Sequence, residues 1–459
     1  MIGIFLICVA AFFILVWHSR LAGVSLGLPI AFLFAMLLQY LPGAFAHVVR
    51  RDFFEDSSAT EIGLRFTAIG TVCFVLGVVL AQRLMGKVPG KFDTRWLYLD
   101  GTTRFAVHCY FGGWTMVIVA LYLGRIPSLG AALDHGATIW ILGVMIGILA
   151  AVQKGQPGQL LLWLAALSVY PLVVLIHSGF LSFGSTSVFV VMASLLMLTK
   201  RHVRAYAFLV LFSVICFLLF LSYYQNRGGI REAVWGGASL QERTARCTAI
   251  ISDFAWFHSD NPNQLRALDE RLNQSQFAGM AAQKIESRGI AFLHGRSIWE
   301  GLQALVPRAL WPGKPIFAGS SQLIRDFTDF QVNDTTTFGV GQVMEFYINF
   351  GIPSLVAGFL LFGFAYGWID RKAATALMGG EYHRVIMWFL LGIAMNAPLA
   401  SISEILGNVA AAVVAGYGWH FALGIFDAKM PVRRQRRKGP AVNAKGTAGT
   451  VPAETRQGD

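Results

Sequence analysis

The stretch AYAFLVLFSVICFLLFLSY, residues 205–223, decides the fold class of this chain. None of its 19 residues is charged, and about 20 apolar residues in a helix are enough to cross the ~30 Å hydrocarbon core of a bilayer. Stretches of this type recur along the sequence and predict a membrane protein with many spans. We count eleven predicted spans, at residues 2–17, 21–41, 62–82, 105–123, 136–153, 159–177, 181–199, 205–223, 351–369, 385–400 and 404–425.

The composition agrees with this interpretation. Hydrophobic residues make up 55% of the chain, charged residues 14%, and the mean hydropathy is +0.57. Soluble globular domains carry roughly 25% charged residues. The first span lacks the basic start and the cleavage site of a signal peptide, so we expect it to remain as a helix. The predicted fold is an all-α, polytopic membrane helical bundle of about 11 transmembrane helices.

The net charge of +12 is distributed unevenly between alternating loops. Cytoplasmic loops carry an excess of Lys and Arg, and basic patches there attract anionic lipid. We therefore expect an external N-terminus, a cytoplasmic C-terminus, membrane lipid as a partner, and no binding of nucleic acid. One set of loops and the tail hold most of the cations, whereas the alternating set has only Arg50, Arg51 and Arg125 among its short loops.

This topology divides the chain into four regions. Residues 1–224 form helices 1–8, 225–350 an external loop between helices 8 and 9, 351–427 helices 9–11, and 428–459 a basic, disordered cytoplasmic tail. The loop holds 12 of the chain's 25 acidic residues and is too long to be a simple connection. Its sequence predicts short helices. Capping boxes occur at Ser239-x-x-Glu242 and Ser297-x-x-Glu300, and apolar faces at Ile298/Leu302/Leu305, Leu265/Leu268/Leu272 and Leu323/Ile324/Phe327.

Within the loop, residues 306–315 combine three prolines, a tryptophan and two cations. Proline fixes φ and removes a backbone donor, so this segment is neither a helix nor a central strand. A stiff backbone that holds Arg308 and Lys314 lowers the ordering cost of binding an anion. A proline-stiffened surface loop with two solvated cations explains the same pattern equally well.

Two further polar groups lie at the ends of the loop. If the eighth span continues as a helix, Arg227 and Arg231 at i,i+4 share a face suited to a diphosphate. The alternative is a pair of interfacial arginines that snorkel. Gln342, Glu345 and Asn349, with Tyr347 beside them, form a polar stripe leading into the ninth span. A capping role for Glu345 alone remains open.

Several kinds of chemistry are disfavoured by the sequence. The chain has no phosphate-binding G-x-x-x-x-G-K-[ST] and no dinucleotide-binding G-x-G-x-x-G after a predicted strand. The five cysteines show no disulfide or metal-ligand spacing. We therefore expect neither a cofactor nor a metal.

The run Pro307-Arg308-Ala309-Leu310-Trp311-Pro312-Gly313-Lys314-Pro315 resembles the P-R-x-x-W-P-x-K-P signature of the Wzy-type O-antigen and exopolysaccharide repeat-unit polymerases. The segment from Glu345 to Gly351 is similar to the acidic-aromatic-Asn-Phe-Gly entry of that family to the next span. The specific match covers residues 296–354. Relatives often carry an Arg in a mid-chain Gly-Ser-Arg turn, and residues 182–187 here have none, which shifts phosphate binding to Arg227 and Arg231.

The resemblance implies a glycosyltransferase-C-like fold in the bacterial inner membrane, with the loop in the periplasm. The implied activity is metal-independent polymerisation of undecaprenyl-diphosphate-linked oligosaccharide units, alongside a flippase and a chain-length co-polymerase. It implies Glu345 or His294 as the general base, with Asp334 and Glu404 as the next candidates. Diphosphate charge would meet Arg308, Lys314, Arg227, Arg231 and Arg296, and sugars would meet Trp299, Trp311, Tyr347, Asn349 and Gln342.

Two other functions are alternatives. An O-antigen ligase shares this architecture and uses the same donor with a different acceptor, the lipid A-core. A glycan transporter belongs to a different class and needs no large external loop. A transporter also predicts inverted repeats, which we do not find in the sequence.

Overall fold

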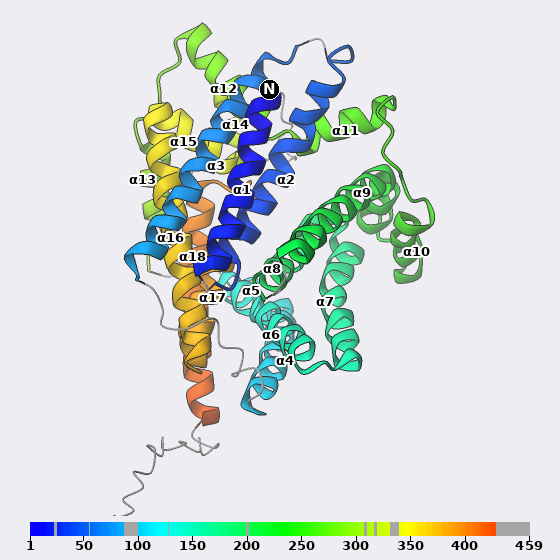
Figure 1. The fold of residues 1–459 in the computed structure, drawn as a ribbon, viewed down its shortest axis with the longest axis vertical. Helices are drawn as coiled ribbons and strands as arrows, with labels where there is room; N and C mark the ends of the chain where they lie inside the picture. The colour runs from blue at the N-terminus through cyan, green and yellow to red at the C-terminus, as the bar shows by residue number, and fades with distance from the viewer. Residues whose placement is uncertain are drawn as a thin grey trace, which may run out of the picture. The chain divides into compact units, whose positions relative to one another are not determined.

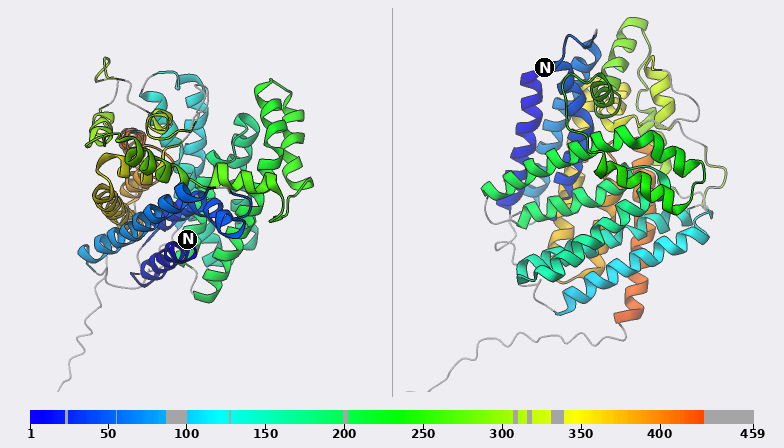
Figure 2. Two further views of the ribbon diagram at one scale, coloured as in Figure 1. Left: turned by 90° about the horizontal axis from the view of Figure 1, so that it is seen from above. Right: turned by 90° about the vertical axis from the view of Figure 1, so that its right-hand side faces the viewer.

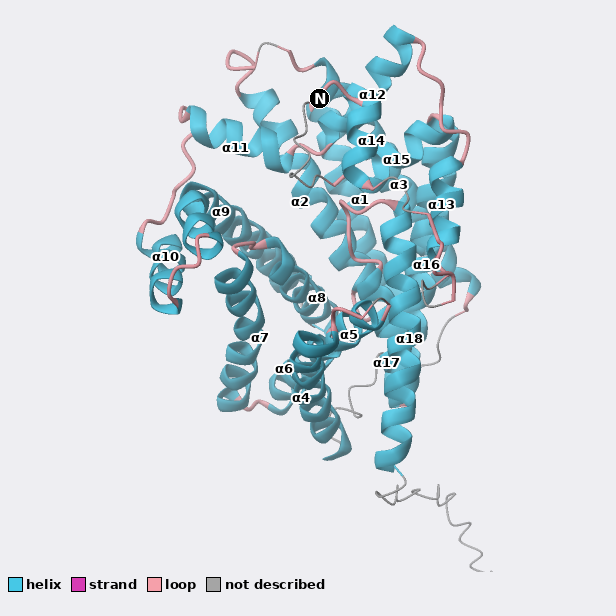
Figure 3. Cartoon of the chain, turned by 180° about the vertical axis from the view of Figure 1, so that it is seen from behind, coloured by secondary structure: helices cyan, strands magenta, loops and turns pink. Residues whose placement is uncertain are grey.

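The computed structural model describes residues 1–22, 25–54, 56–86, 100–126, 128–198, 202–306, 310–315, 319–330 and 339–427. Regular structure within these ranges is entirely helical (Figure 3). The chain divides into two units, Met1–His420 and Phe421–Asp459. Every described helix lies in the first unit, apart from the last residues of the final one.

Eighteen helices lie in the described ranges (Figure 1). Those before the loop region are α1 (Ile2–Ala22), α2 (Leu28–Val49), α3 (Ser58–Leu84), α4 (Asp100–Leu123), α5 (Leu129–Ala137), α6 (Ile139–Lys154), α7 (Pro157–Ser178), α8 (Ser182–Leu198) and α9 (His202–Trp235). The loop region holds α10 (Leu240–Ser252), α11 (Pro262–Leu272), α12 (Ser275–Arg288), α13 (Arg296–Ala304), α14 (Ser320–Phe327) and α15 (Gly341–Phe350). The chain then forms α16 (Ile352–Met378), α17 (Tyr382–Ala394) and α18 (Ile402–Asp427).

The helical membrane fold predicted from the sequence is confirmed. Among the described residues, nine stretches are helical, long and apolar enough to cross a membrane: α1, α2, α3, α4, α5 with α6, α7, α9, α16 and α18. Two predicted spans correspond to shorter apolar helices, α8 and α17. The chain leaves helical conformation after Ala394, inside the predicted span 385–400. Eleven spans therefore stay a prediction.

The loop region agrees with the sequence at several points and corrects it at others. α9 continues to Trp235, so Arg227 and Arg231 lie on a helix as expected. Ser239 is the N-cap of α10 and accepts a hydrogen bond from the Glu242 N–H. The second capping box was wrong, because α13 begins at Arg296, and Ser297 is a buried residue of its first turn.

The amphipathic faces of α11 and α14 pack on their neighbours. Leu265, Leu268 and Leu272 of α11 form a buried cluster with Ala46 of α2 and Leu221 of α9. In α14 the predicted face, Leu323, Ile324 and Phe327, is also buried. α11, α12 and α14 lie at the end of the bundle where the N-terminus is found (Figures 1 and 2). Their apolar faces thus close this end of the bundle.

The predicted polar stripe does not run straight into the next span. α15 ends at Phe350, and Gly351 has φ 71° and ψ −145°, a conformation that L side chains rarely adopt. α16 starts at Ile352, after this break in the helix. The stripe therefore lies on a separate short helix, inside the protein.

Glycines allow α3 and α16 to pack closely. A Cβ on Gly363 of α16 would lie 2.1 Å from the Phe74 carbonyl oxygen, and one on Gly77 of α3 would lie 2.2 Å from the Leu360 carbonyl oxygen. Gly367 follows Gly363 at the G-x-x-x-G spacing and faces Val78 and Ala81. Small residues at such contacts let backbones approach where lipid gives no hydrophobic drive for helix association.

The junction between α1 and α2 is held by a buried carboxylate. Asp370 of α16 accepts hydrogen bonds through Oδ1 from the N–H groups of Leu26 (3.0 Å) and Leu28 (3.1 Å). The first N–H groups of a helix have no partner within it. Asp370 therefore caps the start of α2 from another helix.

We expect Gly363→Ala to destabilise the protein, because the added methyl group meets a backbone carbonyl that cannot move without shifting α3. Overpacking of this kind costs typically 1–3 kcal/mol. The control is Gly407→Ala in α18, where an added Cβ meets nothing within 4 Å and alanine favours the helix. Thermal unfolding in detergent should show a lower Tm for the first variant only. Equal melting temperatures would contradict the close α3–α16 contact.

Candidate functional site

The polar stripe of α15 forms the centre of the candidate site. Gln342, Glu345 and Asn349 are 1%, 1% and 0% exposed. Each has an acceptor oxygen that is buried without a hydrogen-bond partner in the described part of the chain: Gln342 Oε1, Glu345 Oε1 and Asn349 Oδ1. Buried polar atoms are normally satisfied, so unpaired ones indicate a role beyond packing.

The other atoms of Glu345 and Asn349 connect α15 to α13 and α18. Glu345 Oε2 accepts a hydrogen bond of 2.7 Å from the N–H of Ile402, the first residue of α18. Asn349 Nδ2 donates to Ser297 Oγ at 2.8 Å and to the Glu345 carbonyl at 2.7 Å. The carboxyl group thus caps one helix and lies beside the first turn of another.

Burial raises the pKa of Glu345 from its ordinary value of 4.5 to about 7. Hydrogen bonds from Ile402 and Ser297 oppose this shift in pKa, and the nearby carboxylates of Glu404 and Glu300 add to it. A carboxyl group with a pKa near 7 changes protonation easily at neutral pH, as a general base or acid requires.

Gln342 holds the non-helical segment between α17 and α18. Its Nε2 donates to the carbonyls of Ala397 (2.9 Å) and Ala400 (2.7 Å). The backbone N–H of Gly341 donates to the Leu399 carbonyl at 3.0 Å. Buried backbone outside a helix needs such partners. The side-chain N–H groups of Gln342 therefore have a structural role, because they hold this segment in place.

His294, Arg296 and Tyr347 lie around the same helix. The N–H of His294 donates to the Asn349 carbonyl (3.1 Å), and its φ of 48° is unusual for a residue other than glycine. Tyr347 stacks on Phe66, with ring centroids 4.3 Å apart, and burial raises its pKa. Arg296 is exposed and pairs with Glu300 at 2.9 Å. The structure thus brings six predicted site residues together.

The proline-rich segment shows a different role for its lysine. Lys314 Nζ donates to the carbonyls of Ala304 and Val306, both at 2.9 Å, at the C-terminal end of α13. Lys314 therefore caps the C-terminal end of α13.

The remaining predicted site residues lie elsewhere. Trp311 is 36% exposed. Arg308 and Asp334 lie outside the described residues. Glu404 accepts hydrogen bonds from the Ser401 N–H and the Ser320 hydroxyl.

Arg227 and Arg231 belong to a separate cluster. The Arg227 guanidinium lies over the Tyr224 ring, and that of Arg231 over Phe180 and Trp235. Burial lowers the pKa of Arg271 on α11, and the charges of Arg227 and Arg231 lower it further. α9 packs on α7, α8, α10 and α11, whereas α15 packs on α3, α12, α13, α14 and α16. In Figures 1 and 2, α9 and α15 lie on opposite sides of the bundle.

The family described as domain of unknown function (DUF8712) matches residues 30–392, well over half of the chain. The chain belongs to the DUF8712 family. No curated protein and no solved structure matches it. The family match includes nearly all of α2, all of α3 to α16 and most of α17, and therefore the whole of α15 and its partners except α18.

Sequence reasoning missed two important residues of this DUF8712 protein. Ser297 contacts Asn349 and the Glu345 carboxyl group, but its spacing to Glu300 suggested a cap instead. Arg271 lies 40 residues or more from Arg227 and Arg231 and joins them only through the packing of α11 on α9. Neither relation has a signal in local sequence.

The raised pKa of Glu345 predicts a pH-dependent stability. A carboxyl group with a raised pKa in the folded protein stabilises the fold below its ordinary pKa, and this contribution is lost as the pH rises through the folded pKa. The window runs from 4.5 to about 7. Glu345→Gln retains the shape without the titration, so it should be more stable than wild type at pH 8, by up to about 3 kcal/mol, and match it at pH 4.5. Exposed Glu286→Gln is the control. If the difference in stability between wild type and Glu345→Gln were the same at pH 4.5 and at pH 8, the raised pKa of Glu345 would be contradicted.

Proposed function

We propose that this protein polymerises lipid-diphosphate-linked oligosaccharide units on the external side of the membrane, at the site around α15. The buried Glu345 carboxyl group, with a pKa of about 7, is the observation that carries the proposal. It lies in a helical membrane protein beside a segment that resembles the repeat-unit polymerases. The specific substrate class is undecaprenyl-diphosphate-linked glycan in the bacterial inner membrane.

Polymerisation needs a base that takes the proton of the acceptor hydroxyl group. Glu345 Oε1 has no hydrogen-bond partner in the described part of the chain, so a lone pair is free to accept that proton. His294 is exposed, next to the Asn349 carbonyl, and is the second candidate. Because Glu345 is 1% exposed, the proposal requires α13, which carries Ser297, to shift when the acceptor binds.

The donor's diphosphate needs cations where its charge develops. Arg296 begins α13, the helix that carries Ser297, and Arg308 follows the same helix in the sequence, whereas Lys314 is occupied as a helix cap. Arg227, Arg231 and Arg271 lie close enough for the charges of the first two to lower the pKa of the third. Guanidinium groups gathered in this way are suited to the two-pronged recognition of phosphate oxygens. The two groups suit the two diphosphates of a reaction between lipid-linked donor and lipid-linked acceptor.

The sugar portion needs a polar groove with an apolar wall. A groove of about 460 Å³ lies along α12 and the residues after α14, between Met280, Gln283, Ser287, Arg288, Asp329 and Phe330. α12 also packs on α15. This groove offers amide, hydroxyl and charged groups beside an aromatic ring, which suits an oligosaccharide.

The proposal requires a defined orientation, with α10–α15 external and the C-terminal tail cytoplasmic. A membrane-impermeant maleimide applied to intact cells should label a cysteine at exposed Gln322 on α14, and label one at Ala444 only after lysis. The five native cysteines are buried or half-buried, and the unmodified protein gives the background. Labelling of the Ala444 position in intact cells would reverse the topology and exclude a periplasmic polymerase.

The activity test uses purified protein with lipid-linked repeat units and follows polymer ladders. We expect Glu345→Gln to slow polymerisation by 10²–10⁴-fold, because it keeps the cap of α18 and removes the base. Glu286→Gln, an exposed glutamate on α12, should polymerise like wild type. A ladder of normal rate from Glu345→Gln, with normal Tm, would exclude Glu345 as the base and direct attention to His294.

The same assay separates the alternatives. A ligase would transfer a single glycan to a lipid A-core acceptor and form no ladder from repeat units alone. A transporter would give neither product but would move labelled lipid-linked units between vesicle leaflets. Arg231→Ala should raise the concentration of donor needed for half-maximal rate if the arginine cluster holds a diphosphate.

A further inference from the structure

We propose that Ser57, His47 and Asp269 form a second catalytic centre, which transfers or hydrolyses an apolar acyl group held in a carboxylic ester. The proposal does not depend on the polymerase function. It rests on two side chains ten residues apart and a third that is 222 positions from His47, which meet at one end of the bundle.

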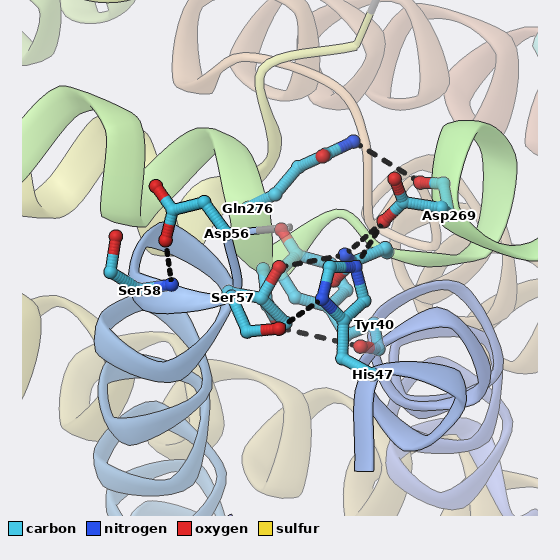
Figure 4. A network of polar contacts seen from close by, with 10 residues as sticks. Tyr40, His47, Asp56, Ser57, Ser58, Asp269 and Gln276 are labelled. Atoms are coloured by element: carbon cyan, nitrogen blue, oxygen red, sulfur yellow. Dashed lines mark hydrogen bonds and ion pairs between the residues drawn. The ribbon is translucent and has the colours of Figure 1, made fainter. Parts of the chain in front are cut away.

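The three side chains are linked by short hydrogen bonds (Figure 4). His47, at the end of α2, has Nδ1 2.8 Å from Ser57 Oγ and Nε2 2.7 Å from Asp269 Oδ1. Ser57 directly precedes α3, and Asp269 belongs to α11. The order is hydroxyl, imidazole and carboxylate, as in enzymes that activate serine, although here the serine faces Nδ1.

Asp269 fixes the tautomer that such chemistry requires. A carboxylate beside Nε2 favours the proton on that nitrogen, which leaves the lone pair of Nδ1 for the Ser57 proton. His47 is 3% exposed, and its ring stacks on Phe54 with centroids 3.8 Å apart. Asn273 Nδ2 donates to Asp269 Oδ1 at 2.7 Å. The base is therefore held in one orientation, and Asp269 acts as a positioning residue.

Ser57 occupies a position where a serine normally has another task. It is the N-cap residue of α3, yet its hydroxyl makes no capping hydrogen bond. The hydroxyl bonds to His47 instead, and the residue is partly exposed. The first hydrogen bond of the helix runs from the N–H of Glu61 to the Ser57 carbonyl. The N–H of Ser58 donates to the Asp56 carboxylate. The following N–H groups, of Ala59 and Thr60, have no partner within the helix and lie where a developing oxyanion gains from the helix dipole.

The apolar acyl group is inferred from a groove on the same two helix turns. A groove of about 270 Å³ lies between α2, α9 and α11, and its wall is almost entirely apolar. It is lined by Ala46 and Val49, which lie on either side of His47 in α2, and by Leu268, which precedes Asp269 in α11. Phe45 and Val49 are about half exposed, so the groove is open at one side.

The chemical step is an ordinary acyl transfer. Ser57 Oγ attacks the ester carbonyl carbon while its proton passes to His47 Nδ1. The carbon–oxygen bond to the alcohol then breaks, and the alcohol oxygen takes the proton from His47. Water, or the hydroxyl group of a second molecule, attacks the acyl-serine, gives its proton to His47, and releases the acyl group. Ser57 regains that proton as the free hydroxyl.

The first test uses the unmodified full-length protein in detergent and a fluorophosphonate probe. Ser57 Oγ should attack phosphorus and expel fluoride, which leaves a covalent adduct that peptide mass spectrometry locates. We expect the adduct on Ser57 and not on its exposed neighbour Ser58, and hydrolysis of p-nitrophenyl butyrate by the same preparation. Absence of both the Ser57 adduct and butyrate hydrolysis, between pH 6 and 9, would overturn the proposal.

Variants then separate catalysis from a merely structural link between α2, α3 and α11. Ser57→Ala should abolish labelling, whereas Ser58→Ala should label like wild type. Asp269→Asn should lower the labelling rate by 10²–10⁴-fold and change its pH profile, because the tautomer of His47 is no longer fixed. Equal labelling rates and pH profiles for wild type and Asp269→Asn would exclude a catalytic role for the contact between His47 and Asp269. Turnover of phospholipid in phosphatidylglycerol vesicles would identify a lipid ester as the substrate. Turnover of soluble p-nitrophenyl butyrate alone would identify an ester outside the bilayer as the substrate.

Discussion

Buried backbone groups that lack a helical partner are the constraint on which the rest of this structure depends. The chain leaves helical conformation before α2 and again between α17 and α18, and each break leaves buried N–H and C=O groups that need a partner from elsewhere in the protein. Asp370 accepts the N–H groups of Leu26 and Leu28 at the first break. Gln342 and Glu345 meet the carbonyls of Ala397 and Ala400 and the N–H of Ile402 at the second. Buried side chains from distant helices thus provide the hydrogen bonds that these backbone groups need.

This constraint also explains why Glu345 has unusual chemistry. Capping α18 draws the carboxyl group into the protein, and burial then favours its neutral form. Its two oxygens have different tasks, since Oε2 binds Ile402 and Oε1 is buried without a partner in the described chain. The proposed catalytic role would use Oε1, whereas the structural role uses Oε2. The two roles are compatible because they use different atoms.

The charged groups of the loop region separate into two areas with opposite character. Around α15 lie three carboxyl groups, of Glu345, Glu404 and Glu300, and at the end of α9 lie arginines whose charges repel one another. In the proposed reaction the carboxyl group of Glu345 would accept a proton, and the guanidinium groups would bind the phosphates of a lipid-linked substrate.

Local sequence determined the all-helical membrane fold, the amphipathic faces of α11 and α14, and the cap at Ser239, because each depends on the periodicity or chemistry of neighbouring residues. It also identified the residues of α15, whose spacing alone shows a polar stripe. Only the tertiary structure decided what those residues do. Lys314 caps α13 rather than facing solvent, Ser297 meets Glu345, and Arg271 joins Arg227 across two helices. The same holds for His47, Ser57 and Asp269, whose hydrogen bonds span up to 222 positions. Such contacts arise from the packing of whole helices, which depends on glycine contacts and buried caps that no window of local sequence contains.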